Sequence, residues 1–211
     1  MLSPEKRTAF SHTLSHYLPA SAVEPVLDYI VLHSIQMHIT RERFSKLGDY
    51  RAPSAANKHH AISINGNLPP LFFLWVMLHE MAHLETFLKY RNGVSPHGHE
   101  WQECYRTLLL QYRHHFPEEV ARLIDRYTKV VPLNRATGRK IEVMLRQQGS
   151  PSADDSTILD DLQPGSRFVI RQKPGIVFEA IERRRTRWKC RDIGSGTTYL
   201  VAGTAIVEPK E

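Results

Sequence analysis

The sequence predicts an α+β protein in which a helix-rich N-terminal domain precedes a small all-β C-terminal domain. Up to residue 147, most apolar residues recur at helical spacing, and two short stretches instead alternate apolar and polar residues as a half-buried strand does. Residues 158–211 contain only short strand-like segments separated by turn residues. Residues 148–157 hold no large apolar side chain, which is typical of a flexible linker. We therefore predict domains at residues 1–147 and 158–211.

The first part of the N-terminal domain is predicted to hold two helices and a small antiparallel sheet. Helical spacing in residues 11–29 is broken by a proline, so two short helices are expected there. Strand-like alternation follows in residues 31–39 and again in residues 60–64. Turn residues at 48–49 and 53–58 are predicted to separate the strands of the sheet. Later in this domain, residues 117–130 and 135–147 have helical composition, which predicts two more helices.

The most informative segment is the apolar stretch Pro69–Tyr90, because it contains the H-E-x-x-H pattern of His79, Glu80 and His83. Residues four apart lie on one face of a helix, so both imidazoles can reach one metal ion. Glu80 is then placed to accept a proton from a metal-bound water rather than to bind the metal itself. The pattern therefore predicts a zinc hydrolase.

Chance is the alternative explanation of this pattern, since 12 of the 211 residues are His. From this composition we expect an accidental match in roughly a few per cent of such chains. The preceding run Leu71–Leu78 is apolar on all sides, so its helix should be buried. Two imidazoles and a carboxylate that continue a buried helix are costly unless a ligand binds them. This context favours a metal site over an accidental match.

A catalytic zinc ion usually has three protein ligands and leaves its fourth position to water, so a third ligand is required. Asn92-Gly93 is predicted to end the long helix, and Ser95-Pro96 is predicted to begin another helix that runs back past it. The spacing alone does not choose between the side chains near the start of that second helix. The four candidates for the third ligand are His97, His99, Glu100 and Glu103.

Taken together, His79–His83 and the later His97-Gly98-His99-Glu100-Trp101 resemble the SprT-like (Spartan or SprT-type) zinc metalloprotease family. That family has HExxH followed by HGxx with an aromatic residue, and its His before the Gly is the third zinc ligand. The resemblance therefore implies that His97 is the third ligand here. It covers about residues 1–115, roughly half the chain. Three earlier segments are similar to the strands and turn that precede the active-site helix in the family: 38–41, 46–51 and 60–65.

The resemblance implies a zincin-like catalytic domain, in which a small antiparallel sheet accompanies the HExxH helix and the third-ligand helix. One zinc ion held by His79, His83 and His97 is the expected cofactor, and Glu80 is the expected general base of an endopeptidase. The exposed edge of the sheet would hold an extended protein or peptide substrate. Proteins bound to or crosslinked with DNA are the implied substrates, so DNA is a second expected partner.

The cysteines and the apolar segments bear on the location of the protein. Many SprT-like proteins end in a zinc ribbon of four cysteines, whereas this chain has only Cys104 and Cys190 and no C-x-x-C pair. A second, structural zinc site is therefore not expected. Two isolated cysteines and the lack of a signal-like N-terminus predict free thiols and a cytoplasmic protein. The longest apolar run, Leu68–Leu78, is too short to cross a bilayer, so no membrane partner is expected.

The C-terminal domain is predicted to be a small SH3-like or related barrel, because short strands alternate with turns at 173–175 and 194–196. Residues 166–211 carry ten Lys or Arg against five acidic residues, an excess of +5 in a chain of net charge +6. This balance permits attraction to a polyanion. The five predicted strands are 167–171, 176–181, 187–191, 198–201 and 205–207.

A basic cluster falls at a predicted hairpin of this domain and consists of Arg183, Arg184, Arg185, Arg187, Trp188 and Lys189. Its cations can bind nucleic-acid phosphates, and Trp188 can stack on a base if it faces outward. The alternative is a solvated turn whose Trp belongs to the core. For the whole chain, two rivals to the peptidase stay open: a catalytically silent zinc-binding scaffold and a nucleic-acid-binding regulator with a structural zinc site. Intact Glu80 argues against the first.

Overall fold

The computed structural model describes residues 3–43, 46–55, 57–148, 157–170, 173–185 and 187–210. Within these residues the protein is a mixed α/β chain with six α-helices, one three-stranded sheet and one five-stranded sheet. It divides into two compact units, Met1–Ile141 and Glu142–Glu211. The helix α6 (Arg135–Gln147) crosses the boundary between the units, and most of the predicted linker at 148–157 lies outside the described residues. The predicted linker therefore stays a prediction.

The first unit begins with two helices, as the proline break predicts. The helix α1 (Pro4–Ser15) is capped by the side chain of Ser3, and α2 (Val23–Leu32) follows a short 3-10 turn at Ala20–Ala22. Arg7 of α1 forms ion pairs with two carboxylates of α2 and so joins the exposed sides of the two helices. The opposite side of α2 is buried through Val23, Val26, Leu27 and Ile30.

The sheet of the first unit consists of β1 (Gln36–Thr40), β2 (Gly48–Arg51) and β3 (Ala61–Asn65), with β3 in the middle. β2 pairs with β3 in the antiparallel direction, but β1 is parallel to β3, so the prediction of an antiparallel sheet was wrong for β1. Alternation along one strand reveals its buried face and not its partner, which is why the pairing was missed. Residues 48–49 were also predicted wrongly, because they begin β2 instead of forming a turn.

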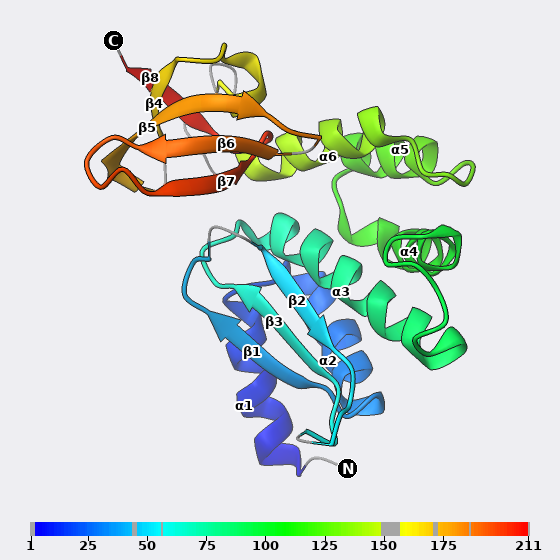
Figure 1. Ribbon diagram of the computed structural model, residues 1–211. Helices are drawn as coiled ribbons and strands as arrows, with labels where there is room; N and C mark the ends of the chain where they lie inside the picture. Colours follow the sequence, from blue (N-terminus) through cyan, green and yellow to red (C-terminus); the bar gives the residue numbers. More distant parts are fainter. Residues whose placement is uncertain are drawn as a thin grey trace. The chain divides into compact units, whose positions relative to one another are not determined.

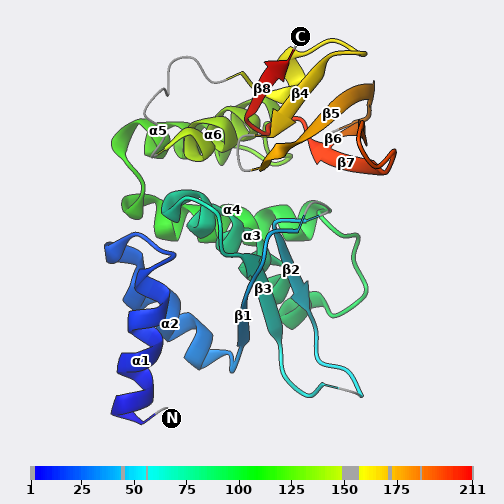
Figure 2. The same ribbon diagram turned by 90° about the vertical axis from the view of Figure 1, so that its left-hand side faces the viewer.

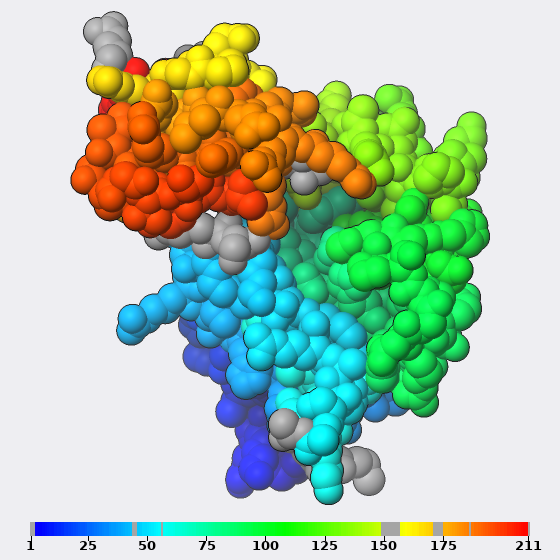
Figure 3. Space-filling view, viewed as in Figure 1, coloured from blue at the N-terminus to red at the C-terminus, as the bar shows by residue number. Residues whose placement is uncertain are grey.

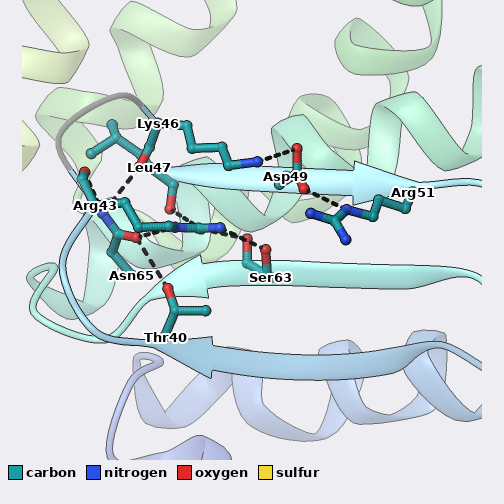
Figure 4. A network of polar contacts seen from close by, with 8 residues as sticks. All are labelled: Thr40, Arg43, Lys46, Leu47, Asp49, Arg51, Ser63 and Asn65. Carbon is teal, nitrogen blue, oxygen red and sulfur yellow. Dashed lines mark hydrogen bonds and ion pairs between the residues drawn. The ribbon is translucent and has the colours of Figure 1, made fainter.

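A network of polar contacts joins Arg43, which follows β1, and Lys46, which precedes β2, to residues of β3 (Figure 4). The Arg43 guanidinium donates hydrogen bonds to the Asn65 side-chain oxygen and to the Ser63 hydroxyl, both at 2.9 Å. Asn65 is 1% exposed, and its amide donates to the backbone oxygens of Arg43 and Lys46 at 3.1 Å. Because buried polar groups are held by such bonds, the start of β2 has a defined position next to the helices.

The long helix α3 (Pro70–Tyr90) forms the centre of the first unit, where it contacts β2 and β3 on one side and α4 (His99–Tyr112) on the other (Figures 1 and 2). Its side chains Phe72, Phe73, Leu74, Met77 and Leu78 are fully buried, as expected for a helix that is apolar on all sides. The predicted helices at 117–130 and 135–147 are present as α5 (Glu118–Tyr127) and α6.

By length and composition, α3 is also apolar enough to cross a membrane. However, 67% of its most apolar window is buried inside the protein, and the core helix of a soluble protein meets the same criterion. The burial of α3 is therefore explained by its packing within the first unit.

The second unit is a five-stranded antiparallel sheet with the order β7-β6-β5-β4-β8. Phe168, Phe178, Ala180 and Cys190 are fully buried and form its core, because alternate residues of adjacent strands face inward. The turn predicted at 194–196 is confirmed, whereas residues 173–175 belong to a strand. The last predicted strand starts later than expected. The strands are β4 (Arg167–Ile170), β5 (Lys173–Arg183), β6 (Arg187–Asp192), β7 (Thr198–Ala202) and β8 (Val207–Lys210).

Candidate metal centre

Three imidazoles converge at the junction of α3 and α4. His79 and His83 lie one turn apart on α3, and His97 reaches them from the loop before α4, so that one ring nitrogen of each lies within 4.8 Å of the others. The Nε2 atoms of His79 and His97 are 3.0 Å apart. A tetrahedral zinc ion with bonds of about 2.0–2.1 Å would separate two ligand nitrogens by about 3.3 Å. The triad is therefore close enough to bind a single metal ion.

Of the four candidates for the third ligand, the structure brings His97 to the pair on α3. In the described part of the chain, His99, Glu100 and Glu103 do not belong to any group of side chains close enough to share a metal ion. His99 is the first residue of α4 and is exposed, so it is carried away from the triad by the helix. The order His-Gly-His thus places only its first member at the centre.

The backbone around His97 explains why α4 begins at His99 and not at Ser95-Pro96, as predicted. His97 has a φ of 60°, a conformation that L-residues seldom adopt and that often occurs at functional sites. The Gly98 N–H donates to the Ser95 carbonyl at 2.9 Å, and a Cβ on Gly98 would lie 2.9 Å from that same oxygen. Gln102 donates to the His97 carbonyl at 3.1 Å. A tight turn therefore holds the third imidazole in place.

Trp101, on the first turn of α4, packs against all three imidazoles. The centroid of its ring system lies 4.7 Å from His79, 5.4 Å from His83 and 4.6 Å from His97. Tyr105 stacks behind it at 4.8 Å, and Trp101 itself is 5% exposed. Aromatic contact covers this side of the triad and limits the orientations that the imidazoles can adopt.

The surroundings of the three imidazoles lower their pKa values and so favour the neutral form. The loss of solvation lowers the pKa of His79 well below its ordinary value, and the neighbouring His83 and His97 lower it further. Burial, and then the neighbouring His97, lower the pKa of His83 to about 4, and loss of solvation lowers the pKa of His97. Because only neutral imidazole binds a metal, the triad is in its binding form without further proton loss.

Glu80 lies beside the triad, on the side of α3 that faces β2. Its side chain is 6% exposed and packs so closely on Gly48 that a Cβ there would lie 2.5 Å from Oε1. Burial, and then the nearby Asp49 carboxylate, raise the pKa of Glu80 to about 8, although a hydrogen bond from the Tyr50 backbone N–H opposes the shift. A carboxyl group with a pKa near neutrality can both accept and release a proton at working pH.

Sequence reasoning did not identify Tyr50 and His60 as neighbours of this centre. The Tyr50 hydroxyl is 2.9 Å from His60 Nδ1, and the Tyr50 ring is nearly parallel to the His83 ring, with 6.5 Å between centroids. His60 in turn packs edge-on against Phe87, one helical turn beyond His83. These contacts depend on the register of β2 against β3, and the prediction of a turn at 48–49 concealed that register.

The basic cluster divides into exposed and buried members. Arg183, Arg184 and Arg185 are exposed at the β5–β6 hairpin, which is closed by a 2.7 Å hydrogen bond from Arg184 N to the Arg187 carbonyl. Trp188 is 3% exposed, and its indole N–H donates to Asp160 at 2.6 Å. The suggestion that Trp188 stacks on a base is therefore corrected, because alternation along β6 turns this side chain into the core.

The other cations of the basic cluster lie on the outer face of β6, and two of the exposed arginines form ion pairs. Arg187 and Lys189 are half-buried on β6, on the face opposite to Trp188. Arg183 donates to the Asp160 carboxylate at 3.0 Å, so part of its charge is balanced within the second unit. Arg184 contacts the exposed Glu182 at 3.6 Å. The cluster thus remains a positively charged surface at one end of the sheet, without an exposed tryptophan.

Comparisons with protein-family models, with curated proteins and with solved structures gave no match to this chain. The assignment of its chemistry therefore depends on its own residues and their geometry.

Proposed function

We propose that the protein is a zinc-dependent endopeptidase of SprT-like type, with a zincin-like catalytic domain in the first unit. One observation carries the proposal: a buried carboxyl group, Glu80, adjoins three convergent neutral imidazoles without belonging to the triad itself. Three nitrogen ligands with a fourth position left to water suit catalytic Zn²⁺ better than the oxygen-seeking Mg²⁺ or Ca²⁺. His79, His83 and His97 hold the ion in this proposal.

Zinc, when bound, polarises a carbonyl group and lowers the pKa of water, which supplies the hydrolytic chemistry. The protein residues do the remaining work. Glu80 accepts a proton from the attacking water and then donates it to the leaving amine, a double role that its pKa of about 8 favours. Trp101 packs on the imidazoles from the α4 side, whereas Glu80 borders them from the side of α3 that faces β2.

The position of β2 supports binding of an extended peptide next to the centre. β2 is an edge strand of its sheet, and its Tyr50 backbone N–H donates to the Glu80 carboxylate. Figure 3 shows the surface hollowed between the cyan segment that includes β2 and the green segment that includes the start of α4. Strand addition to the free edge of β2 would lay a substrate backbone along this hollow.

The second unit supports a role with DNA-bound or DNA-crosslinked proteins. In this proposal it is an SH3-like module whose exposed Arg183, Arg184 and Arg185 bind phosphates and so bring the peptidase to its substrates in the cytoplasm. Phosphate contacts of this kind position a protein without reading sequence. The expected specificity is therefore for DNA as a polyanion, and the sequence of the DNA should matter little.

The test is cleavage of a DNA-binding protein by the zinc-loaded protein and by Glu80→Gln, each with and without single-stranded DNA. We expect cleavage that requires Glu80 and increases with DNA. Glu85→Gln is the matched control, because Glu85 lies on the same helix but bonds to Tyr29 and not to the triad. No cleavage by either protein would refute the peptidase and favour a zinc-binding scaffold, whereas equal cleavage by Glu80→Gln and the unmodified protein would refute Glu80 as the general base.

A further inference from the structure

The pair formed by Tyr50 and His60 borders the metal centre but has no part in the mechanism above. In the β2–β3 register, Gly48 lies opposite Ile64 and Tyr50 opposite Ile62, and both isoleucines are fully buried. Side chains that are directly opposite in an antiparallel pair share one face of the sheet. Gly48 contacts Glu80 on this face, so Tyr50 projects toward the same side of α3.

Three contacts place Tyr50 on the side of the triad that faces β2. Its backbone N–H donates to the Glu80 carboxylate, its ring is within 4° of parallel to the His83 ring, and its hydroxyl is 2.9 Å from His60 Nδ1. Trp101 approaches the imidazoles from α4 instead. Tyr50 therefore borders both the base and a metal ligand from β2, the strand to which a peptide substrate would add.

We propose that Tyr50 is a catalytic residue, whose hydroxyl donates a hydrogen bond to the carbonyl oxygen of the scissile peptide bond, and that His60 is the residue that positions this hydroxyl. The inference rests on the proposed peptidase function and names a residue that stabilises its transition state. Negative charge develops on that oxygen when the nucleophile adds, and fixed donors at such an oxygen make large contributions to catalysis. No covalent bond to Tyr50 forms in this role.

The hydrogen bond to His60 leaves the hydroxyl proton free for the substrate when the Nδ1 of His60 carries the ring proton. In that tautomer Nδ1–H donates to the phenol oxygen, and the phenol O–H has no other use within the pair. His60 is held by its edge-on contact with Phe87, whose ring centroid is 5.8 Å away. The phenol is thus oriented before substrate arrives, which reduces the reorganisation that the reaction requires.

The first experiment compares Tyr50→Phe with the unmodified zinc-loaded protein on a DNA-binding protein substrate. We expect kcat to fall about 100-fold, as for the loss of one oxyanion donor, with KM changed by less than about threefold. The zinc dissociation constant, measured by competition with a chromophoric chelator, should not change. Tyr29→Phe is the control, because Tyr29 is also half-buried and bonded to a side chain, Glu85, but does not contact the triad.

The role of His60 is tested by a conservative and a disruptive substitution. His60→Asn retains a side-chain N–H near the place of Nδ1 and should keep most of kcat, whereas His60→Leu removes it and should lower kcat about tenfold or more. Both variants should bind zinc normally. Equal kcat values for His60→Asn and His60→Leu would overturn the positioning role.

A binding measurement separates failure of this inference from failure of the peptidase proposal. The probe is acetohydroxamate, and its binding to the Co²⁺-loaded protein is followed by the visible absorption of the metal. If the unmodified protein cleaves no substrate, the peptidase proposal fails. A tenfold or greater weakening of acetohydroxamate binding in Tyr50→Phe would still support the Tyr50 hydroxyl as a hydrogen-bond donor to a ligand of the metal.

If the unmodified protein cleaves substrate, and both kcat and acetohydroxamate affinity are unchanged in Tyr50→Phe, the inference is wrong while the peptidase proposal stands. A fall in kcat accompanied by an equal fall in zinc affinity would also overturn it, since Tyr50 would then be structural.

Discussion

At the scale of single residues, Gly48 is the position on which the geometry of the base depends most directly. The Glu80 side chain occupies the space that a Cβ at position 48 would need, with Oε1 at 2.5 Å from that point and Cγ at 2.8 Å. Real Cβ atoms do not approach so closely, so either the carboxylate or the strand must move if the glycine is replaced. Glycine is required here for close approach and not for a special φ angle.

Gly48→Ala should therefore impair catalysis more than it impairs metal binding. We expect kcat to fall at least tenfold, because displacement of a catalytic group by a fraction of an ångström is costly, while the zinc dissociation constant stays within about twofold. Gly175→Ala is the matched control, since a Cβ at Gly175 meets no atom within 4 Å. Unchanged kcat in Gly48→Ala would contradict the placement of Glu80 against β2.

The raised pKa of Glu80 predicts a pH-dependent cost to the metal-free fold. Its folded-state pKa of about 8 exceeds the ordinary value of 4.5, so the carboxyl group contributes most to stability when protonated, and this contribution is lost as pH rises through about 8. Glu80→Gln stays neutral at every pH. At pH 9 its free energy of unfolding should exceed that of the unmodified protein by on the order of 2–4 kcal/mol, so it should unfold at a higher temperature. At pH 4 the two should be equal. Thermal unfolding of the metal-free proteins at the two pH values is the measurement.

The histidines act in the opposite direction in the same experiment. Their lowered pKa values mean that the unfolded chain binds more protons, so stability of the metal-free protein should decrease as pH falls below about 6.5 toward the pKa of about 4 of His83. This decrease should be seen most clearly in Glu80→Gln, because in the unmodified protein the raised pKa of Glu80 adds stability on acidification between about pH 8 and 4.5 and so offsets part of it. A stability of Glu80→Gln that instead increases on acidification from pH 6.5 would contradict the lowered pKa values of the imidazoles.

At the scale of the helices and strands, the sequence predicts best those elements whose own pattern is complete. The buried helix that carries His79 and His83 was predicted at 69–90 and runs from Pro70 to Tyr90, and α6 has the predicted bounds of 135–147. Both have sustained helical spacing. In these elements local helix propensity and the pattern of buried residues agree, so a short window of sequence is enough to predict the helix and its bounds.

Elements whose form depends on distant contacts were predicted less well. Gly48 and Asp49 have the composition of a turn, but they form the start of β2, because the glycine gives Glu80 its space and the strand pairs with β3. Ser95-Pro96 has the composition of a helix start, yet α4 begins three residues later, because the turn that holds His97 intervenes. In both cases the residues that override local preference adjoin the metal centre, where such conflicts are expected.

The packing of α4 on α3 gives a further prediction, because Trp101 contacts every imidazole of the triad. Trp101→Leu should raise the zinc dissociation constant about tenfold or more, since residues that orient metal ligands commonly contribute that much to affinity. Trp75→Leu is the matched control: Trp75 is equally buried, but its ring contacts are with Tyr105, Phe116 and Tyr127. That variant should lose stability and keep zinc affinity. Equal zinc affinity in Trp101→Leu would show that the triad needs no aromatic support.

At the scale of the whole molecule, the chain combines a candidate catalytic unit with a basic β-sheet unit. The positive charge of the second part could be predicted from its composition. The side of the sheet on which Trp188 lies could not, because the direction of each side chain near a hairpin depends on the strand register. The structure assigns Trp188 to the core and leaves Arg184 and Arg185 as exposed cations. Among the described residues of this hairpin, the exposed members of the cluster are arginines, so we expect nucleic acid to bind here by electrostatic attraction.

Arg184→Ala/Arg185→Ala should weaken binding of single-stranded DNA and reduce its salt dependence. Each lost phosphate contact should lower the slope of log affinity against log salt by about 0.7. This double variant leaves the hydrogen bond between Arg183 and Asp160 intact, so the sheet should keep its stability. Arg122→Ala/Arg126→Ala on α5 removes the same charge from the first unit and serves as the control. Equal affinity and equal salt slopes for the two double variants would contradict a specific role for the basic cluster.

The central claim is a single zinc centre made by His79, His83 and His97, since every catalytic step proposed here requires it. The most direct test is a zinc titration of the purified protein, of His97→Ala and of His99→Ala, followed by competition with a chromophoric chelator. We expect one tightly bound zinc ion in the unmodified protein and in His99→Ala, and a loss of at least 100-fold in zinc affinity in His97→Ala. Tight one-to-one binding that survives His97→Ala, or that is lost in His99→Ala instead, would contradict this assignment of the ligands.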